Sequence, residues 1–154
     1  MNEIPKELLD TVCHTTTVES FLSICESGYI FINPDPSILK HKKFGNAQDE
    51  NNQTYVQNLG GVSVFDFKNF SIEAYNRYLN NTWEALSPEL YRFLPNHNRN
   101  QQDGFSVWMI IDTTKCKTYI NRESLYRQWQ TAQIKGLKFI PKVEAAILSD
   151  ISIE

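Results

Sequence analysis

Hydrophobic residues fall into short blocks along the chain, and the spacing inside each block indicates its secondary structure. From Thr17 to Gly28, apolar side chains recur three and four residues apart, which predicts a helix that the Thr17 hydroxyl caps and Gly28 ends. The same spacing predicts further helices over residues 71–86 and 122–133. The chain is therefore expected to contain three amphipathic helices.

Blocks rich in β-branched and aromatic residues predict the strands. The clearest block, residues 60–67, begins at a Gly-Gly turn and is predicted to lie in the centre of a sheet. The other predicted strands are residues 8–14, 29–32, 105–112 (buried), a part of 139–148, and 151–153. Helices and strands do not alternate regularly, so we expect an α+β fold in a single domain over residues 1–154.

Two polar segments interrupt these blocks, at residues 40–59 and 96–104. Both are expected to be loops, because they lack apolar periodicity and the first is rich in Asn and Gln. Long loops in compact domains often serve function. The first segment is therefore expected either to cover a site or to be disordered.

Charge is spread unevenly, although the net charge of −3 excludes a strongly basic nucleic-acid wrapper. Residues 1–36 hold six acids and one base, whereas residues 115–142 hold seven bases, one acid and the aromatics Tyr119, Tyr126 and Trp129. Bases interleaved with aromatics suit a phosphate-bearing strand with stacked nucleobases. The alternative is a solvated helix face with a few core aromatics.

The three cysteines form no CxxC pair, and Cys13 and Cys25 lie among apolar residues. Buried free thiols in a reducing compartment are the expected state. The N-terminus has no signal-peptide pattern, and no run approaches the length of a membrane span. We therefore expect a soluble, cytoplasmic protein with no membrane partner.

Two residues stand out as candidates for chemistry. His14 lies where a predicted strand meets a helix, followed by three threonines, so an imidazole, hydroxyls and backbone amides are available to ribose and phosphate oxygens. Glu144 interrupts an apolar strand, and is expected either on an exposed face or in a cleft where it performs chemistry. Taken alone, a structural role for His14 and an exposed position for Glu144 are the simpler interpretations.

Other common sites are not indicated. His41 and His97 have no partner at a metal-ligand spacing, so no metal is expected. The sequence contains no GxGxxG, no GxxxxGK[ST] and no nucleophile elbow, which argues against Rossmann, P-loop and serine-hydrolase sites.

In combination, these features resemble the ADP-ribosyltransferase superfamily, in particular its His-Tyr-Glu branch. The resemblance runs from Cys13 to Glu144 through short motifs. They are a strand ending in His14-Thr15, a helix ending in Ser27-Gly28-Tyr29-Ile30, a strand led by Gly60-Gly61 and followed by a helix, and a late strand with Glu144. The resemblance implies a split β-sheet core with flanking helices, and NAD as co-substrate.

The resemblance also implies a role for each matching residue. Glu144 would be the catalytic carboxylate, and His14 would bind the adenosine ribose with Thr15 or Thr16 nearby. Gly28 and Tyr29 would approach the nicotinamide, and Ser63 would border its pocket. The remaining pocket residues would be Phe65, on the strand of Ser63, and Tyr75, which competes with Tyr29 as the stacking aromatic.

The sequence departs from the arginine-modifying branch of this superfamily. It lacks the Ser-Thr-Ser motif, and Lys142 stands where a second carboxylate would precede Glu144 by two residues. These departures favour an RNA or DNA acceptor, as in a bacterial toxin or phage-defence effector that an antitoxin could neutralise. The acceptor would be bound through Lys115, Lys117, Arg122, Arg127 and Lys135. The alternatives are a protein acceptor and a non-catalytic module that binds a nucleotide or ADP-ribose.

Overall fold

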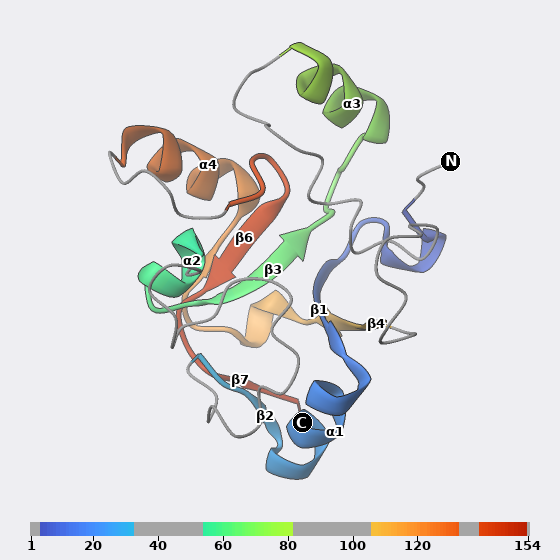
Figure 1. The fold of residues 1–154 in the computed structure, drawn as a ribbon, viewed down its shortest axis with the longest axis vertical. Coiled ribbons are helices and arrows are strands. Elements are labelled where there is room, and N and C mark those ends of the chain that lie inside the picture. Colours follow the sequence, from blue (N-terminus) through green and yellow to red (C-terminus); the bar gives the residue numbers. More distant parts are fainter. Residues whose placement is uncertain (1–3, 33–53, 82–105, 133–138, 154) are drawn as a thin grey trace.

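The computed structural model describes residues 4–32, 54–81, 106–132 and 139–153. A five-stranded antiparallel sheet, in the order β4-β1-β3-β6-β5, forms the centre of the fold, and β2 pairs with β7 in a separate two-stranded sheet. The strands are β1 (Val12–Thr17), β2 (Tyr29–Ile30), β3 (Val62–Asp66), β4 (Ser106–Ile111), β5 (Tyr119–Ile120), β6 (Glu144–Ile147) and β7 (Ile151–Ser152). The predicted α+β class is therefore confirmed, and Figure 1 shows its arrangement.

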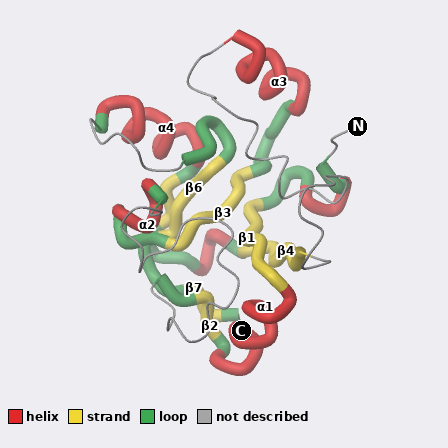
Figure 2. The backbone as a smooth tube through the Cα atoms, in the orientation of Figure 1, coloured by secondary structure: helices red, strands yellow, loops and turns green. Residues whose placement is uncertain are grey.

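Helices surround this sheet (Figure 2). They are α1 (Val18–Ser27), α2 (Tyr55–Asn58), α3 (Ile72–Asn81) and α4 (Arg122–Thr131), together with 3-10 turns at Lys6–Leu8 and Thr113–Lys115. The three predicted helices are present, although residues 82–86 of the second and residue 133 of the third lie outside the described residues, as does the expected 96–104 loop.

Local signals set the ends of α1 as expected. The Thr17 hydroxyl accepts a hydrogen bond from the Ser20 amide at 3.1 Å, which is the N-cap geometry. Gly28 follows the helix with φ +83°, and its amide donates to the Ile24 carbonyl at 2.8 Å. This left-handed conformation favours glycine, so the sequence pattern identified both ends of the helix.

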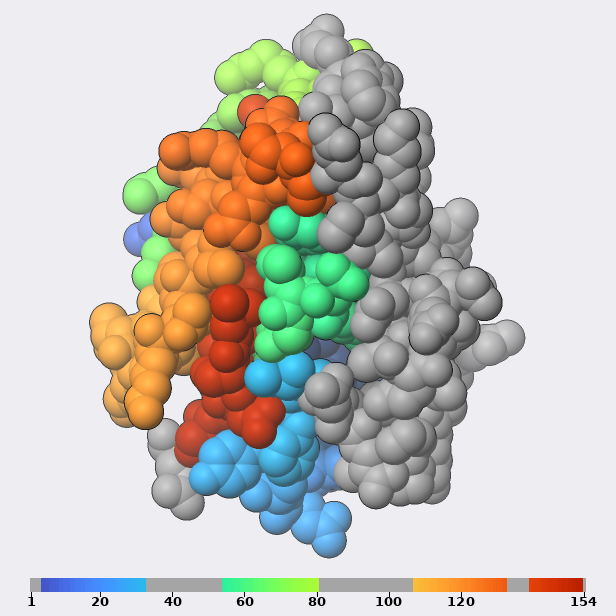
Figure 3. Space-filling view, turned by 90° about the vertical axis from the view of Figure 1, so that its left-hand side faces the viewer, coloured from blue at the N-terminus to red at the C-terminus, as the bar shows by residue number. Residues whose placement is uncertain are grey.

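The two faces of the large sheet are covered by different elements. On one face, Val12, Val64 and Ile147 form a cluster with Ile30 of β2 and Ile151 of β7, against which Ile24 of α1 packs. On the other face, Phe65 packs with Tyr75 of α3, and Ala146 packs with Val56 of α2 and Leu125 of α4. Figure 3 shows α2 on the surface between α4 and the β2 segment.

Several expectations about individual elements were wrong. The expected buried strand at residues 105–112 is β4, which is an edge strand with Ile110 60% exposed. The end of the expected 40–59 loop is the short helix α2, which has a full capping box at Thr54 and buries Tyr55. Residues 40–53 of that loop lie outside the described residues.

Strand boundaries also differ from the sequence prediction. The first strand begins at Val12 rather than residue 8, because Lys6–Leu8 form a 3-10 turn. The second covers Tyr29–Ile30 alone, and β5 was not predicted. The strands Tyr29–Ile30 and Tyr119–Ile120 are each only two residues long. Whether so short a segment forms a strand depends on a distant partner strand rather than on a local sequence pattern.

Candidate active site

Glu144 begins β6 in the interior of the protein, where it is 4% exposed. Its Oε2 accepts a hydrogen bond from the Ser63 hydroxyl at 2.7 Å, and its Oε1 accepts one from the Ile140 amide at 2.9 Å. The turn at residues 141–143 brings Ile140 back to the carboxyl group, with Lys142 in the left-handed region at φ +66°. Of the two alternatives for Glu144, the exposed position is therefore wrong, and the carboxyl group is buried and held at both oxygens.

Ser63, on β3, joins this carboxyl group to the first strand. Its hydroxyl contacts Glu144, and its carbonyl oxygen lies 2.9 Å from Nδ1 of His14. The neighbouring residues Val62 and Val64 are core residues of the opposite face, so strand alternation fixes the direction of the Ser63 side chain. Ser63 therefore links residues of β1 and β6 through both its backbone and its side chain.

His14 lies where β1 separates from β3. The β1–β3 pairing covers Val12 with Asp66 and Cys13 with Phe65, whereas β1 remains paired to β4 as far as Thr17. The β1–β3 pairing ends at Cys13. The Ser63 carbonyl oxygen then contacts the imidazole of His14 instead of a backbone amide of β1. A carbonyl oxygen only accepts, so Nδ1 carries the proton and Nε2 is left as an acceptor. Figure 1 shows β1 and β3 diverging from the end where they pair.

Burial shifts the protonation of both titratable groups toward their neutral forms. It raises the pKa of Glu144 to about 7, although the hydrogen bonds from Ser63 and Ile140 favour the charged form. It lowers the pKa of His14 from its ordinary value, and the bond to the Ser63 carbonyl acts in the opposite direction. At neutral pH the pair is thus an uncharged imidazole and a carboxyl group near its midpoint of ionisation.

The alternation of side chains along the strands determines on which face of the sheet His14 and Glu144 lie. Alternation along β1 places His14 on the face of Val12, whereas the pairing of Glu144 with Phe65 places it on the other face. The two side chains therefore do not point at each other across one face. They are connected through Ser63, at the point where β1 and β3 part.

The other predicted pocket residues divide between the faces. Thr16 shares the direction of His14 along β1, whereas Thr15 points to the face of Trp108 and has a buried hydroxyl with no partner among the described residues. Phe65 and Tyr75 are both buried in the cluster beside Glu144. The structure therefore brings Phe65 and Tyr75 to the side of Glu144, and Thr16 to the side of His14.

Gly28 and Tyr29 lie apart from this group, at the start of the two-stranded sheet. The Gly28 amide is used by the α1 cap, and its carbonyl accepts from the Ile153 amide at 3.0 Å, which leaves one carbonyl lone pair for a ligand. The Tyr29 ring is 45% exposed and stacks on Phe31 at 5.8 Å. Of the two candidate stacking aromatics, Tyr75 is the one that packs with a neighbour of Glu144.

The predicted basic residues have different surroundings. Lys115 and Lys117 are exposed near β5, and Arg127 is exposed on α4. Arg122 is instead committed to the fold, because its guanidinium donates to the carbonyls of Asp66 at 3.0 Å and Lys68 at 2.6 Å. Lys135 lies outside the described residues.

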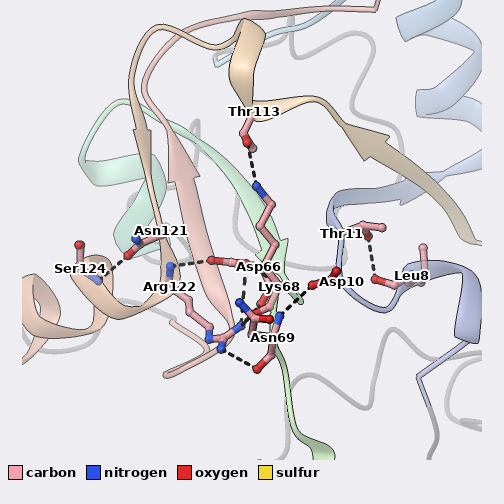
Figure 4. Close-up of polar contacts among 10 residues, drawn as sticks. All are labelled: Leu8, Asp10, Thr11, Asp66, Lys68, Asn69, Thr113, Asn121, Arg122 and Ser124. Carbon is pink, nitrogen blue, oxygen red and sulfur yellow. Dashed lines mark hydrogen bonds and ion pairs between the residues drawn. The ribbon is translucent and has the colours of Figure 1, made fainter.

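The interaction of Arg122 with Asp66 was missed by the sequence analysis. Asp66 is buried at the end of β3 and accepts hydrogen bonds from the amides of Lys68 and Arg122, while the Arg122 guanidinium lies 3.9 Å from its carboxylate (Figure 4). The available signal was an acid inside the apolar run of residues 62–67. That is the same anomaly that singled out Glu144.

The three cysteines differ in their exposure to solvent. Cys13 is buried as expected, but Cys25 is exposed because its side of α1 faces away from the sheet. All three thiols are free. Within the described ranges, no group of three or more His, Cys, Asp or Glu side chains could hold a metal ion. In the same ranges, no helix is long and apolar enough to cross a bilayer.

The arrangement was also compared with known proteins. Protein-family models, curated protein sequences and solved structures gave no match to this chain. The assignment of a function therefore depends on the geometry of His14, Ser63 and Glu144.

Proposed function

We propose that this protein is an NAD-dependent ADP-ribosyltransferase with Glu144 as its catalytic carboxylate. The observation that carries the proposal is the hydrogen-bonded series from His14 through Ser63 to Glu144, which joins β1, β3 and β6. It supports the proposal because three residues far apart in the sequence, each implied by the family resemblance, are connected in space. The proposed acceptor is nucleic acid, in a toxin or defence effector.

The chemistry requires a fixed negative charge. Transfer breaks the bond between nicotinamide and C1′ of its ribose and forms a bond from C1′ to the acceptor, while the acceptor's proton leaves. The ribose acquires oxocarbenium character as the first bond breaks, as in glycoside cleavage. Ionised Glu144 would accept a hydrogen bond from the 2′-hydroxyl and stabilise that cation, and the Ser63 hydroxyl and Ile140 amide hold the carboxylate in position.

His14 is suited to bind rather than to transfer protons. Its pKa is lowered by burial, so the ring is neutral at physiological pH. The Ser63 carbonyl fixes the proton on Nδ1, and Nε2 can accept a hydrogen bond from a ribose hydroxyl. This tautomer supports the ribose-binding role of His14 that the resemblance implies.

The direct test is a variant that keeps the shape of Glu144 but removes its charge. Glu144→Gln should reduce nicotinamide release from NAD by at least about 100-fold, the scale of losing one electrostatic stabiliser, while NAD affinity changes little. Glu26→Gln, at an exposed position of α1, is the matched control and should retain full activity. Nicotinamide release and NAD calorimetry measure the two properties.

Three outcomes would contradict the proposal. Full activity of Glu144→Gln would remove Glu144 from catalysis. Tight binding of NAD or ADP-ribose with no turnover by the native protein would establish a non-catalytic binding module instead. Growth arrest on expression, expected for a toxin, should be relieved by Glu144→Gln, and persistence of the arrest would contradict an enzymatic origin.

A further inference from the structure

A groove of about 500 Å³ is lined by residues of α3 and α4 and by Lys142, in the turn that precedes Glu144. Its walls come from residues 69–78, residues 122–130 and Lys142, and we refer to it as the α3–α4 groove. Its volume is in the range of pockets that hold small organic ligands. The proposed transferase function uses the buried carboxyl group of Glu144, which follows this turn, and gives the groove itself no role.

Aromatic rings form much of the groove wall. Tyr75 and Tyr78 of α3 are 6.3 Å apart, and Tyr78 meets Tyr126 of α4 edge to face at 6.3 Å. Phe70 continues this series at 5.5 Å from Tyr75. Aromatic faces along a groove are the feature on which unpaired nucleobases stack, and stacking tolerates any base because each has a π-face.

Positive charge is placed at the same rings. The Lys142 ammonium lies 4.8 Å from the Tyr78 ring centre and 5.3 Å from that of Tyr126. Arg127 lines the groove from the exposed side of α4, and Glu123 is the one acidic residue among the lining residues. Because Arg122 is bound to Asp66 and backbone carbonyls, Arg127 and Lys142 are the cations that the described part of the groove offers to a ligand phosphate.

Lys142 connects the groove to the candidate catalytic carboxylate. It belongs to the turn at residues 141–143, and the Ile140 amide before that turn donates to Glu144. A ligand held by Lys142 would therefore contact the same turn that positions the carboxylate. This placement suits an acceptor that must approach the ribose as nicotinamide leaves.

We propose that the α3–α4 groove binds the acceptor as single-stranded nucleic acid, with a base against Tyr78 and Tyr126 and phosphates at Arg127 and Lys142. An unpaired strand fits better than a duplex, since stacking on a tyrosine requires an exposed base face. The inference rests on the proposed transferase function for the acceptor role. The binding itself can be measured without NAD.

The test measures the affinity of the full chain for fluorescent single-stranded RNA and DNA 12-mers, without NAD, over a range of salt concentrations. Arg127→Gln and Lys142→Asn should each weaken binding about fivefold at 0.1 M salt and lower the salt slope by about 0.7, the effect of one phosphate contact. Asparagine is chosen because it tolerates the left-handed backbone at residue 142. Lys6→Gln, an exposed cation that does not line the groove, is the control and should bind like the native protein.

A second pair of variants tests stacking. Tyr126→Leu should weaken binding at least about tenfold, whereas Tyr126→Phe keeps the ring and should bind normally. Circular dichroism and thermal unfolding verify that each variant is folded.

The outcomes separate the groove from the enzymatic proposal. Absence of oligonucleotide binding by the native protein would overturn the groove assignment, as would an equal loss in Lys6→Gln, even if NAD is turned over. A protein labelled from NAD in lysate, with Tyr126→Leu labelling it normally, would overturn it in favour of a protein acceptor. Groove-dependent binding without NAD turnover would support the groove and contradict the transferase.

Discussion

At the scale of single residues, burial and two hydrogen bonds have opposite effects on the ionisation of Glu144. A carboxyl group in an apolar interior avoids ionisation, and two hydrogen bonds offset only part of that cost, so its pKa rises to about 7. A group near its midpoint at neutral pH can take the charged form that the proposed reaction needs. The same property connects the site to folding stability.

Between pH 4.5 and about 7, the folded protein holds a proton on Glu144 that the unfolded chain releases. The contribution of Glu144 to folding stability is therefore fully present below pH 4.5 and is lost as pH rises through about 7. His14 has the opposite sign, because its lowered pKa gives a contribution that is lost as pH falls below 6.5. We therefore predict that Glu144→Gln becomes more stable relative to the native protein between pH 4.5 and 7, by at most about 1.4 kcal/mol per pH unit. Urea unfolding across this range measures the difference.

Comparison with Glu144→Gln isolates one group, since His14 titrates in both proteins. A constant difference for Glu144→Gln would show that the pKa of this carboxyl group is not raised in the folded protein and would contradict the shifted value.

At the scale of elements, the ion pair of the buried Asp66 with the partly buried Arg122 connects the end of β3 to the start of α4. The Arg122 amide and guanidinium both contact Asp66, and the guanidinium also donates to the carbonyls of Asp66, Lys68 and Asn69 (Figure 4). This connection fixes the first turn of α4, the helix that forms one wall of the α3–α4 groove.

Removing one partner leaves a buried charge uncompensated. We predict that Arg122→Met lowers the free energy of unfolding by about 3 kcal/mol, and that Arg122→Met with Asp66→Asn costs less than the sum of the single changes. Chemical denaturation of the two single variants and the double variant measures this coupling. Additive effects would show that the pair does not act as a unit.

At the scale of the whole molecule, stability is expected to be concentrated in the centre of the large sheet. β3 and β6 each have a paired strand on both sides, and cores cover both faces. The β2–β7 sheet consists of the pairs Tyr29 with Ser152 and Ile30 with Ile151. The two sheets should therefore open independently.

We predict that backbone amides of β3 and β6 exchange slowest with deuterium, and that those of β2 and β7 exchange at least about tenfold faster through local opening. Native-state hydrogen exchange read by NMR measures this hierarchy. Equal protection in both sheets would mean that they unfold together as one cooperative unit.

The sequence determined those features that neighbouring residues specify. The Thr17 cap, the left-handed Gly28 and the spacing of apolar residues set α1, because caps and i, i+3, i+4 contacts lie within one or two turns. Alternation and β-branched content likewise indicated β3 and the α+β class. The family resemblance supplied His14, Ser63 and Glu144 as a set, which no local pattern could have done.

Only the tertiary structure decided burial and contact. Period-2 alternation could not show whether Glu144 faced solvent, nor that the similarly apolar β4 is an edge strand, because both depend on which distant elements cover each face. It also decided that β1 separates from β3 after Cys13, which places the His14 ring against Ser63, and that Asp66 meets Arg122. The sequence thus identified residues suited to chemistry, whereas strand pairing across the chain determined which of them meet.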